Sequence, residues 1–203
     1  MLRIGVLSLQ GAVIEHLRML NSLGGVEAVA VKTAPEIASV DALILPGGES
    51  TTMGKLLNDF NLMGFLSQRI GAGMPVWGTC AGMILLAKKI CGQDATYLHA
   101  MDIEVCRNAY GSQLDSFRVK QKIPQVAQSD LPLVFIRAPY VTSVWNDVEV
   151  LSVVDEKIIA CRQKNMLATS FHPELTADLS FHNYFAQMAR SAKEHYTKTE
   201  AAV

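Results

Sequence analysis

Short aliphatic runs alternate with helix-like segments through the first 90 residues, and this alternation limits the fold more than any other feature of the chain. Four of these runs are predicted to be strands: Leu2–Leu9, Val26–Val31, Ala42–Leu45 and Pro75–Trp77. Helices are expected between or after them, at Ala12–Leu23, from about Ser50, and at Ala81–Ile90. Because the runs are mostly apolar and do not alternate with polar residues, both faces of the strands are expected to be covered. The pattern predicts βαβ units and a largely parallel sheet.

The chain changes character between about residues 102 and 171, where strand-like runs replace helical ones. Strands are expected at Asp102–Val105, Ser116–Val119, Leu133–Ile136, Val148–Val153 and Lys157–Ala160, with a hairpin tip at Asp155-Glu156-Lys157. We expect them to extend or flank the central sheet in mixed orientation. An amphipathic helix is predicted at about Leu179–His195, with residues 197–203 frayed. The length of 203 residues predicts a single domain.

Composition excludes several classes of function. The net charge is −1, so no basic excess exists to bind nucleic acid. No apolar stretch approaches the roughly 20 residues that a membrane helix needs, and the first residues do not resemble a signal peptide, so we expect a cytoplasmic protein. The four cysteines form no Cys-x-x-Cys pair, which predicts free thiols rather than disulfides or a zinc site.

A Gly-x-Cys-x-Gly motif, Gly78-Thr79-Cys80-Ala81-Gly82, lies between an apolar strand and an apolar helix. This is the setting of a nucleophile elbow, in which flanking glycines relieve the crowding of a sharp strand-to-helix turn. Cys80 is therefore a candidate nucleophile, with the Ala81 N–H as an oxyanion donor. The alternative is that Cys80 is a small buried hydrophobic residue, as free cysteines usually are and as we expect for the other three cysteines.

A second motif, Phe171-His172-Pro173-Glu174, follows an expected strand at Met166–Ser170. In an extended chain residues i and i+2 point to the same side, so His172 and Glu174 are expected side by side. A carboxylate beside an imidazole orients it as a general base. The alternatives are a surface histidine near a loop and a helix N-terminal carboxylate. His16 and His182 are expected only as helix residues and His195 in the frayed end, and His99 receives no role.

The third motif is a glycine loop, Pro46-Gly47-Gly48-Glu49, at the end of a buried strand. Adjacent glycines permit positive φ and close ligand approach, and their N–H groups are candidate oxyanion donors. Neither phosphate-binding glycine pattern is present. A plain β-turn with Ser50 or Thr51 as helix N-cap is compatible with the same residues.

Together, the three motifs resemble class I (triad-type) glutamine amidotransferase domains. The resemblance is sharper to the glutaminase subunits of pyridoxal 5′-phosphate synthases and runs from residue 1 to about residue 190. The segments that carry it are Ser8-Leu9-Gln10-Gly11-Ala12, Leu45-Pro46-Gly47-Gly48-Glu49-Ser50-Thr51-Thr52, Gly78-Thr79-Cys80-Ala81-Gly82, Asp115-Ser116-Phe117, Phe135-Ile136-Arg137-Ala138-Pro139 and Ser170-Phe171-His172-Pro173-Glu174-Leu175. The Gln-Gly-Ala start and the Gly-Gly-Glu-Ser-Thr-Thr loop are more specific, because glutaminases of other pathways share the rest.

The resemblance implies an α/β fold: a three-layer αβα, flavodoxin-like domain around a central, mostly parallel mixed sheet. It implies hydrolysis of L-glutamine to L-glutamate and ammonia through a γ-glutamyl thioester, with hydrolase and lyase as enzyme classes. By the same resemblance Cys80 is the nucleophile, His172 the general base and acid, and Glu174 its orienter. The oxyanion is assigned to Gly47, Gly48 and Ala81. Glutamine binding is assigned to Gly48, Glu49, Ser50, Arg107, Ile136 and Arg137.

No metal or organic cofactor is implied. The implied partner is a (β/α)₈-barrel synthase subunit, assembled as a dodecamer, that receives the ammonia and whose docking completes the oxyanion hole. Two positions depart from the family pattern near Arg107: Cys106 replaces an acidic residue, and His99 stands where glycine is frequent. A glutaminase of another pathway and a non-catalytic docking or regulatory subunit are the alternatives. The glycine loop disfavours a cysteine peptidase.

Overall fold

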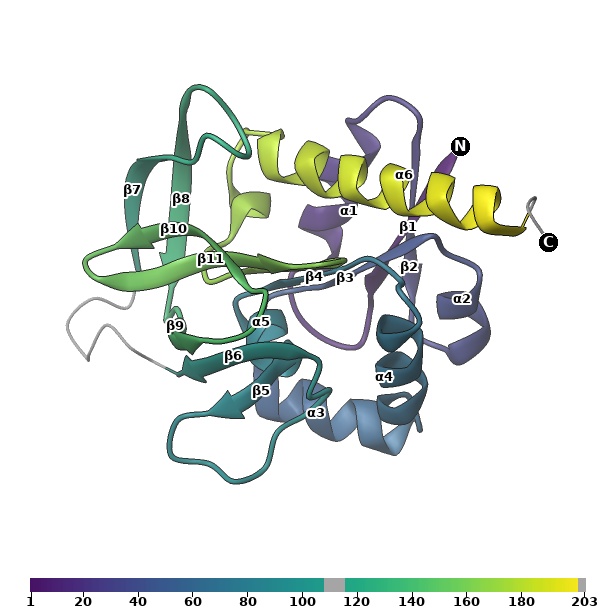
Figure 1. The fold of residues 1–203 in the computed structure, drawn as a ribbon, viewed down its shortest axis with the longest axis horizontal. Coiled ribbons are helices and arrows are strands. Elements are labelled where there is room, and N and C mark those ends of the chain that lie inside the picture. Colours follow the sequence, from purple (N-terminus) through teal and green to yellow (C-terminus); the bar gives the residue numbers. More distant parts are fainter. Residues whose placement is uncertain (108–115, 201–203) are drawn as a thin grey trace.

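Ten strands form one mixed sheet in residues 1–107 and 116–200, which the computed structural model describes (Figure 1). They are β1 (Leu2–Leu7), β2 (Val26–Val31), β3 (Ala42–Leu45), β4 (Val76–Thr79), β5 (Ala87–Ile90), β6 (Met101–Cys106), β9 (Tyr140–Val144), β10 (Glu149–Val154), β11 (Lys157–Gln163) and β12 (Met166–Thr169). Their order is β2-β1-β3-β4-β12-β11-β9-β6-β5, and β10 pairs with β11. The five strands from β2 to β12 are parallel, and β11, β9 and β6 continue the sheet in antiparallel pairs. The predicted mixed, mostly parallel sheet is confirmed.

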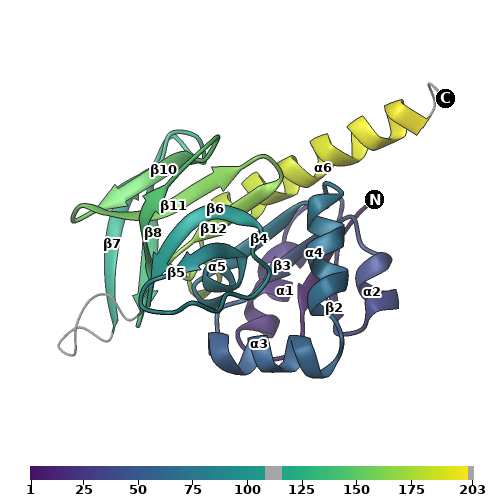
Figure 2. The ribbon, with the colours of Figure 1, turned by 60° about the horizontal axis from the view of Figure 1, so that its bottom comes forward.

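Helices cover both faces of the parallel strands, which makes three layers (Figures 1 and 2). The helices are α1 (Val13–Asn21), α2 (Ala34–Ala38), α3 (Ser50–Asp59), α4 (Met63–Gly71), α5 (Ala81–Leu86) and α6 (Ser180–Glu200), with a 3₁₀ turn, η1, at Pro173–Leu175. One apolar core lies under α2, α3, α4 and α5. A second lies under α1 and α6, where Trp77, Phe181 and Phe185 stack together. The αβα architecture expected for the chain is therefore present.

Strands β7 (Ser116–Lys122) and β8 (Asp130–Ile136) form a separate antiparallel ribbon beside the main sheet. Its side chain Phe135 packs on Phe171, immediately before His172, so the ribbon supports the chain that leaves β12. Asp115, part of one motif quoted above, lies outside the described residues.

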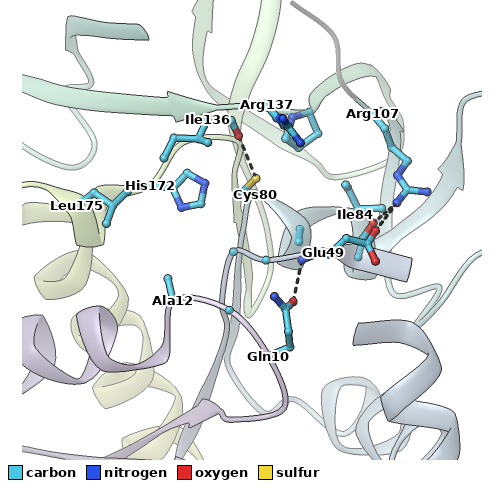
Figure 3. Close-up of a pocket in the computed structure, with 16 residues that line it drawn as sticks. Gln10, Ala12, Glu49, Cys80, Ile84, Arg107, Ile136, Arg137, His172 and Leu175 are labelled. Carbon is cyan, nitrogen blue, oxygen red and sulfur yellow. Dashed lines mark hydrogen bonds and ion pairs between the residues drawn. The ribbon is translucent and has the colours of Figure 1, made fainter. Parts of the chain in front are cut away.

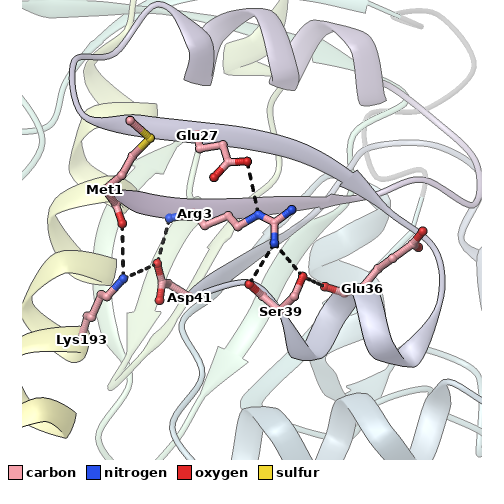
Figure 4. A network of polar contacts seen from close by, with 7 residues as sticks. All are labelled: Met1, Arg3, Glu27, Glu36, Ser39, Asp41 and Lys193. Carbon is pink, nitrogen blue, oxygen red and sulfur yellow. Dashed lines mark hydrogen bonds and ion pairs between the residues drawn. The ribbon is translucent and has the colours of Figure 1, made fainter.

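Polar contacts join helix α6 to the start of the chain and to the residue before β3 (Figure 4). Lys193 of α6 donates to the Met1 carbonyl at 3.3 Å and to Asp41 at 2.9 Å, and Asp41 accepts the Arg3 backbone N–H at 2.8 Å. No helix in the described part of the chain is long and apolar enough to span a membrane.

Several elements differ from the sequence-based expectations. The helix expected at Ala81–Ile90 ends at Leu86, and the next four residues form β5, because they pair with β6. Helices α2 and α4 and strand β9 were not predicted. The hairpin tip is confirmed: Asp155 and Glu156 both have positive φ, as a two-residue turn between β10 and β11 requires. Helix α6 continues through Glu200, past the point at which fraying was expected.

A disulfide joins Cys91 and Cys106, so the expectation of four free thiols is wrong for these two. The parallel pairing of β5 with β6 brings their ends together, and the Cα atoms are 4.9 Å apart. Cys80 and Cys161 are free and buried. Burial raises the pKa of Cys161 to about 12, which fits the role of a small core residue expected for it.

Candidate active site

A cavity of about 570 Å³ opens where the carboxyl ends of β1, β3, β4 and β12 meet (Figure 3). Ligands bind at this edge in open parallel sheets. The lining residues are Gln10, Gly11, Ala12, Gly47, Gly48, Glu49, Ser50, Cys80, Ala81, Ile84, Arg107, Ile136, Arg137, Pro139, His172 and Leu175. Every site residue predicted from the sequence is in this lining except Glu174. The volume is in the usual range for a small-molecule site.

Cys80 lies on a sharp turn between β4 and α5, at φ 48° and ψ −103°, a strained conformation for a residue with a side chain. The flanking glycines are required by close packing. A Cβ atom at Gly78 would collide with the Gly82 backbone, and one at Gly82 would collide with the Leu45 carbonyl. The Cys80 N–H donates to the Thr169 carbonyl of β12 at 2.8 Å. This is the geometry of the predicted nucleophile elbow, with the thiol at the cavity wall.

His172 and Glu174 are in contact, with Nδ1 of the imidazole 2.7 Å from Oε1 of the carboxylate, and both are more than nine-tenths buried. The contact was predicted, but the reason was wrong: the chain after His172 forms the 3₁₀ turn η1 and is not extended. The His172 N–H donates to the Val134 carbonyl of β8 at 2.8 Å. Burial lowers the pKa of His172, but hydrogen bonds to Cys80 and Glu174 and their charges outweigh it and raise this pKa to about 10.

The Gly47-Gly48 loop approaches the other side of the imidazole. Neither glycine is among the residues with positive φ, so the freedom expected of them is not used in this conformation. Close approach is the reason instead: a Cβ atom at Gly47 would overlap the His172 ring, and one at Gly48 would overlap the Gln10 amide. The Gly47 carbonyl accepts the Ala12 N–H at 2.9 Å. In a trans peptide the Gly48 N–H therefore points the opposite way.

Glu49 is the N-cap of α3, so the expected cap by Ser50 or Thr51 is wrong. Its carboxylate accepts the Thr51 and Thr52 N–H groups at 3.0 and 2.6 Å. The Thr52 hydroxyl also donates a hydrogen bond to this carboxylate. Together these hydrogen bonds outweigh the effect of burial and lower the pKa of Glu49 to about 2. Arg107 Nη2 donates to Glu49, Ser50 and Thr51 at 3.3, 2.6 and 2.9 Å. A guanidinium and a carboxylate thus lie together on one cavity wall (Figure 3).

The two departures from the family pattern have structural consequences near this wall. His99 has a φ of 50°, which glycine adopts without strain, and its Nδ1 lies 3.2 Å from the Thr96 hydroxyl. Cys106 is held in the disulfide directly before Arg107.

On the opposite wall of the cavity the Ile136 carbonyl lies 3.9 Å from the Cys80 sulfur, and Arg137 has a φ of 44°.

Sequence reasoning assigned no catalytic or glutamine-binding role to two buried histidines or to six residues of the cavity lining, Gln10 among them. His16 of α1 and His182 of α6 are fully buried beneath the cavity, although both were expected only as helix residues. Gln10 accepts the Glu49 N–H at 2.8 Å and so ties the end of β1 to the glycine loop. The Gln-Gly-Ala motif was a signal for Gln10. For the histidines, no local motif existed.

Comparisons with known proteins identify the family and the fold of the chain. The profile of the SNO glutamine amidotransferase family matches residues 6–191. Two proteins named pyridoxal 5′-phosphate synthase subunit PdxT are similar: the one from Ruminiclostridium cellulolyticum is 59% identical over 93% of this chain and all of its own, and the one from Clostridium botulinum is 53% identical over 91% and 96%. A crystal structure titled glutamine amidotransferase superposes with a TM-score of 0.86 at 40% identity, covering 92% of this chain and 98% of that one.

One expectation is overturned by the family match. Lyase was expected beside hydrolase as an enzyme class. The SNO family is one of glutamine amidotransferases, and releasing ammonia from the glutamine amide with water is hydrolase chemistry. The lyase class is therefore wrong for this chain.

Proposed function

Since the chain belongs to the SNO glutamine amidotransferase family, we propose that it hydrolyses L-glutamine and supplies the ammonia to a pyridoxal 5′-phosphate synthase. The observation that carries the proposal is that His172, hydrogen-bonded to Glu174 behind it, lines the same cavity as the Cys80 elbow. This arrangement has the composition of a nucleophile, a base and an orienter.

His172 takes the proton of Cys80, and the thiolate attacks the side-chain amide carbon of glutamine. His172 then protonates the amide nitrogen, the C–N bond breaks, and ammonia leaves a γ-glutamyl thioester on Cys80. Water, deprotonated by His172, attacks the thioester carbonyl; the C–S bond breaks, glutamate is released and the proton returns to the sulfur. Glu174 holds the His172 tautomer in which Nε2 is free to move the proton.

The negative oxygen formed at each attack is assigned to the N–H groups of Gly48 and Ala81, with Gly47 fixing the orientation of the peptide. Because the Gly47 carbonyl is held by Ala12, any rotation of the Gly47-Gly48 peptide must break that hydrogen bond. A partner that contacts residues 10–12 can therefore control the oxyanion hole directly. This supports activation by docking.

Glutamine binding follows the charges of the cavity walls. The α-ammonium group is assigned to the Glu49 carboxylate and the Ile136 carbonyl, which are acceptors, and the α-carboxylate to Arg107 and Arg137. The Ser50 hydroxyl accepts a hydrogen bond from Arg107 Nη2 at 2.6 Å and so helps to hold the guanidinium in place. The Gly48 backbone completes this subsite, beside the sulfur of Cys80.

For the partner, we propose a (β/α)₈-barrel synthase subunit, assembled as a dodecamer, that docks over the cavity mouth and takes the ammonia past Gln10 and Gly11. Relatives named as subunits of pyridoxal 5′-phosphate synthase support this assignment. We further propose that residues 1–203 act as one glutaminase domain and that the reaction takes place in the cytoplasm.

The test is glutamate release from L-glutamine by the purified chain, alone and with the synthase subunit, for the wild type and Cys80→Ala. We expect release that rises with the synthase and is lost in Cys80→Ala. Release that depends on Cys80 but ignores the synthase would keep the glutaminase and reject this partner. No release from folded protein with a competent synthase would reject the catalytic role and favour a docking or regulatory subunit.

A further inference from the structure

Two fully buried histidines that the mechanism above does not use lie directly beneath the catalytic pair. His16 comes from α1 and His182 from α6, and both rings pack edge-on against Trp77 of β4. Their rings are 5.2 Å apart, with His16 Nδ1 2.9 Å from His182 Nε2. Buried polar rings cost free energy unless their nitrogen atoms are satisfied, so this pair needs an explanation.

The other ring nitrogen of His16 faces the active site. Its Nε2 lies 3.5 Å from Glu174 Oε2 and 3.2 Å from the Thr79 hydroxyl, one residue before Cys80. Glu174 uses Oε1 for His172, and Oε2 is buried with no hydrogen-bond partner at standard geometry among the described residues. The imidazole edge of His16 is thus what Oε2 meets in the protein interior.

Both histidines are neutral at neutral pH, so each carries one N–H. Burial, His182 and His172 lower the pKa of His16 well below its usual 6.5, and burial lowers the pKa of His182 to about 3. The bond between the two rings therefore leaves two arrangements. Either His16 donates from Nδ1 to His182, or His182 donates from Nε2 to His16.

The second arrangement satisfies more buried atoms. If His182 donates, His16 carries its proton on Nε2, where the N–H faces Glu174 Oε2 and Thr79. His182 Nδ1, which has no hydrogen-bond partner in the described part of the chain, is then a lone pair rather than a buried N–H. If His16 donates instead, His182 buries an unpaired N–H, and the Glu174 carboxylate faces a lone pair. An unpaired buried donor and a lone pair against an anion are both unfavourable.

We propose that His16 is a positioning residue, held in its Nε2–H form by His182, that orients and stabilises the Glu174 carboxylate from the side opposite His172. This rests on the proposed function only for its effect on turnover. The triad thereby becomes the last part of a longer chain of hydrogen-bonding groups, His182, His16, Glu174, His172 and Cys80. The N–H groups of His182 and His16 point toward Glu174 from one side, and the Nδ1–H of His172 points toward it from the other.

The first test uses the unmodified protein and needs no activity. Long-range ¹⁵N–¹H correlation spectra of the ¹⁵N-histidine-labelled chain distinguish Nε2–H from Nδ1–H tautomers. We expect His16 and His182 both as neutral Nε2–H forms at pH 7, with His16→Gln and His182→Gln assigning the signals. A neutral Nδ1–H form of His16 would overturn the proposal, whatever the turnover.

The second test uses a matched pair of buried amides. A glutamine at position 16 places an N–H near the former Nε2, whereas an asparagine reaches only the former Nδ1, beside His182. We expect His16→Asn to lower kcat about 10- to 100-fold with little change in KM for glutamine, the scale of lost second-layer support. His16→Gln is expected within about threefold of the wild type. Equal loss in both variants would assign His16 to packing alone.

Alkylation of Cys80 by iodoacetamide separates this proposal from the glutaminase assignment. Cys91 and Cys106 are joined in a disulfide, and Cys161 is fully buried in the core, whereas Cys80 lines the open cavity. Under non-reducing conditions labelling therefore reports Cys80, with Cys80→Ala as the blank. The titratable groups around Glu174 are His16, His172 and, beyond His172, Cys80. The charge of Asp178 acts on His182. Without the His16 N–H the Glu174 anion is less stable, so the acid limb of the rate is expected to move up by about 0.5 pH unit or more in His16→Asn. An unmoved limb contradicts the proposal even if no glutaminase activity is found.

Discussion

At the scale of single residues, His172 combines burial with two ionisable neighbours, and its charge therefore contributes to stability in a defined pH range. Its pKa in the folded chain, about 10, is above the ordinary 6.5. A raised histidine pKa stabilises the fold fully below pH 6.5, and this contribution is lost as the pH rises through about 10. We expect urea unfolding to show a falling free energy between pH 7 and 10 in the wild type.

His172→Gln tests this contribution, because glutamine keeps a polar side chain without titrating. We expect the variant to be less stable than the wild type at pH 7 and to lose less stability on raising the pH to 10. Parallel pH profiles for the two proteins would show that His172 is not charged in the folded state.

The residues of the proposed triad could be predicted from the sequence because each belongs to a short motif with a local cause. Gly78 and Gly82 mark the elbow, and the two-residue spacing of His172 and Glu174 brings them together in either an extended chain or a tight turn. His16 and His182 have no such mark. They are 166 positions apart and meet only because α1 and α6 pack on the same face of the sheet.

At the scale of elements, the residue that caps helix α3 both stabilises the helix and lines the cavity. Glu49 caps the helix and holds Arg107, and its pKa of about 2 is below the ordinary 4.5. A depressed carboxyl pKa gives stability that is present above pH 4.5 and lost as the pH falls through about 2. We expect Glu49→Ala to lower the free energy of unfolding by about 1 kcal/mol and to raise KM for glutamine.

Glu36 provides the matched control, because its carboxylate caps α2 by accepting the Lys32 and Thr33 N–H groups away from the cavity. Glu36→Ala is expected to lower stability without changing KM. A KM effect of equal size in both variants would mean that Glu49 acts on glutamine only through general stability.

The Cys91–Cys106 disulfide links the end of β5 to the end of β6 across 15 positions. A cross-link that closes a loop of this length stabilises a protein by about 3 kcal/mol. We expect dithiothreitol to lower the free energy of unfolding in urea by about this amount. The double variant Cys91→Ser, Cys106→Ser should be less stable and insensitive to the reagent, whereas an identical response of both proteins would contradict the prediction.

Element boundaries were predictable where chain chemistry marks them and not elsewhere. Val26–Val31 and Ala42–Leu45 are bounded by glycine, proline or polar residues, and their predicted limits match the structure. The run from Ala81 to Ile90 is apolar with two lysines and has no glycine or proline after Gly82, so nothing local separates α5 from β5. The change occurs because residues 87–90 pair with β6, a contact between distant parts of the chain.

At the scale of the whole molecule, the parallel order of the first strands was predictable from alternation, but the order of the second half was not. Hydrophobic periodicity indicates that a segment is a strand, but it does not determine which strands lie beside it in the sheet. The sheet places β12 beside β4, while β10 and β11 form the hairpin that precedes it. Strands β7 and β8 form their own ribbon, and Phe135 of that ribbon packs against Phe171 in a long-range contact. These long-range pairings place the residues that follow β4, β8 and β12 around one cavity.

The neighbouring positions of β4 and β12 also have a consequence for the order of events during synthesis. Trp77 of β4 and Thr169 of β12 are hydrogen-bonded across 92 positions of the chain. At about 5–20 residues per second, a ribosome adds the second strand roughly 5–20 s after the first. The nascent chain therefore contains Cys80, the proposed nucleophile, for seconds before His172, its proposed base, has been made. A subunit whose synthesis has not yet passed β12 is expected to leave glutamine intact, because it lacks the residue that would accept the Cys80 proton.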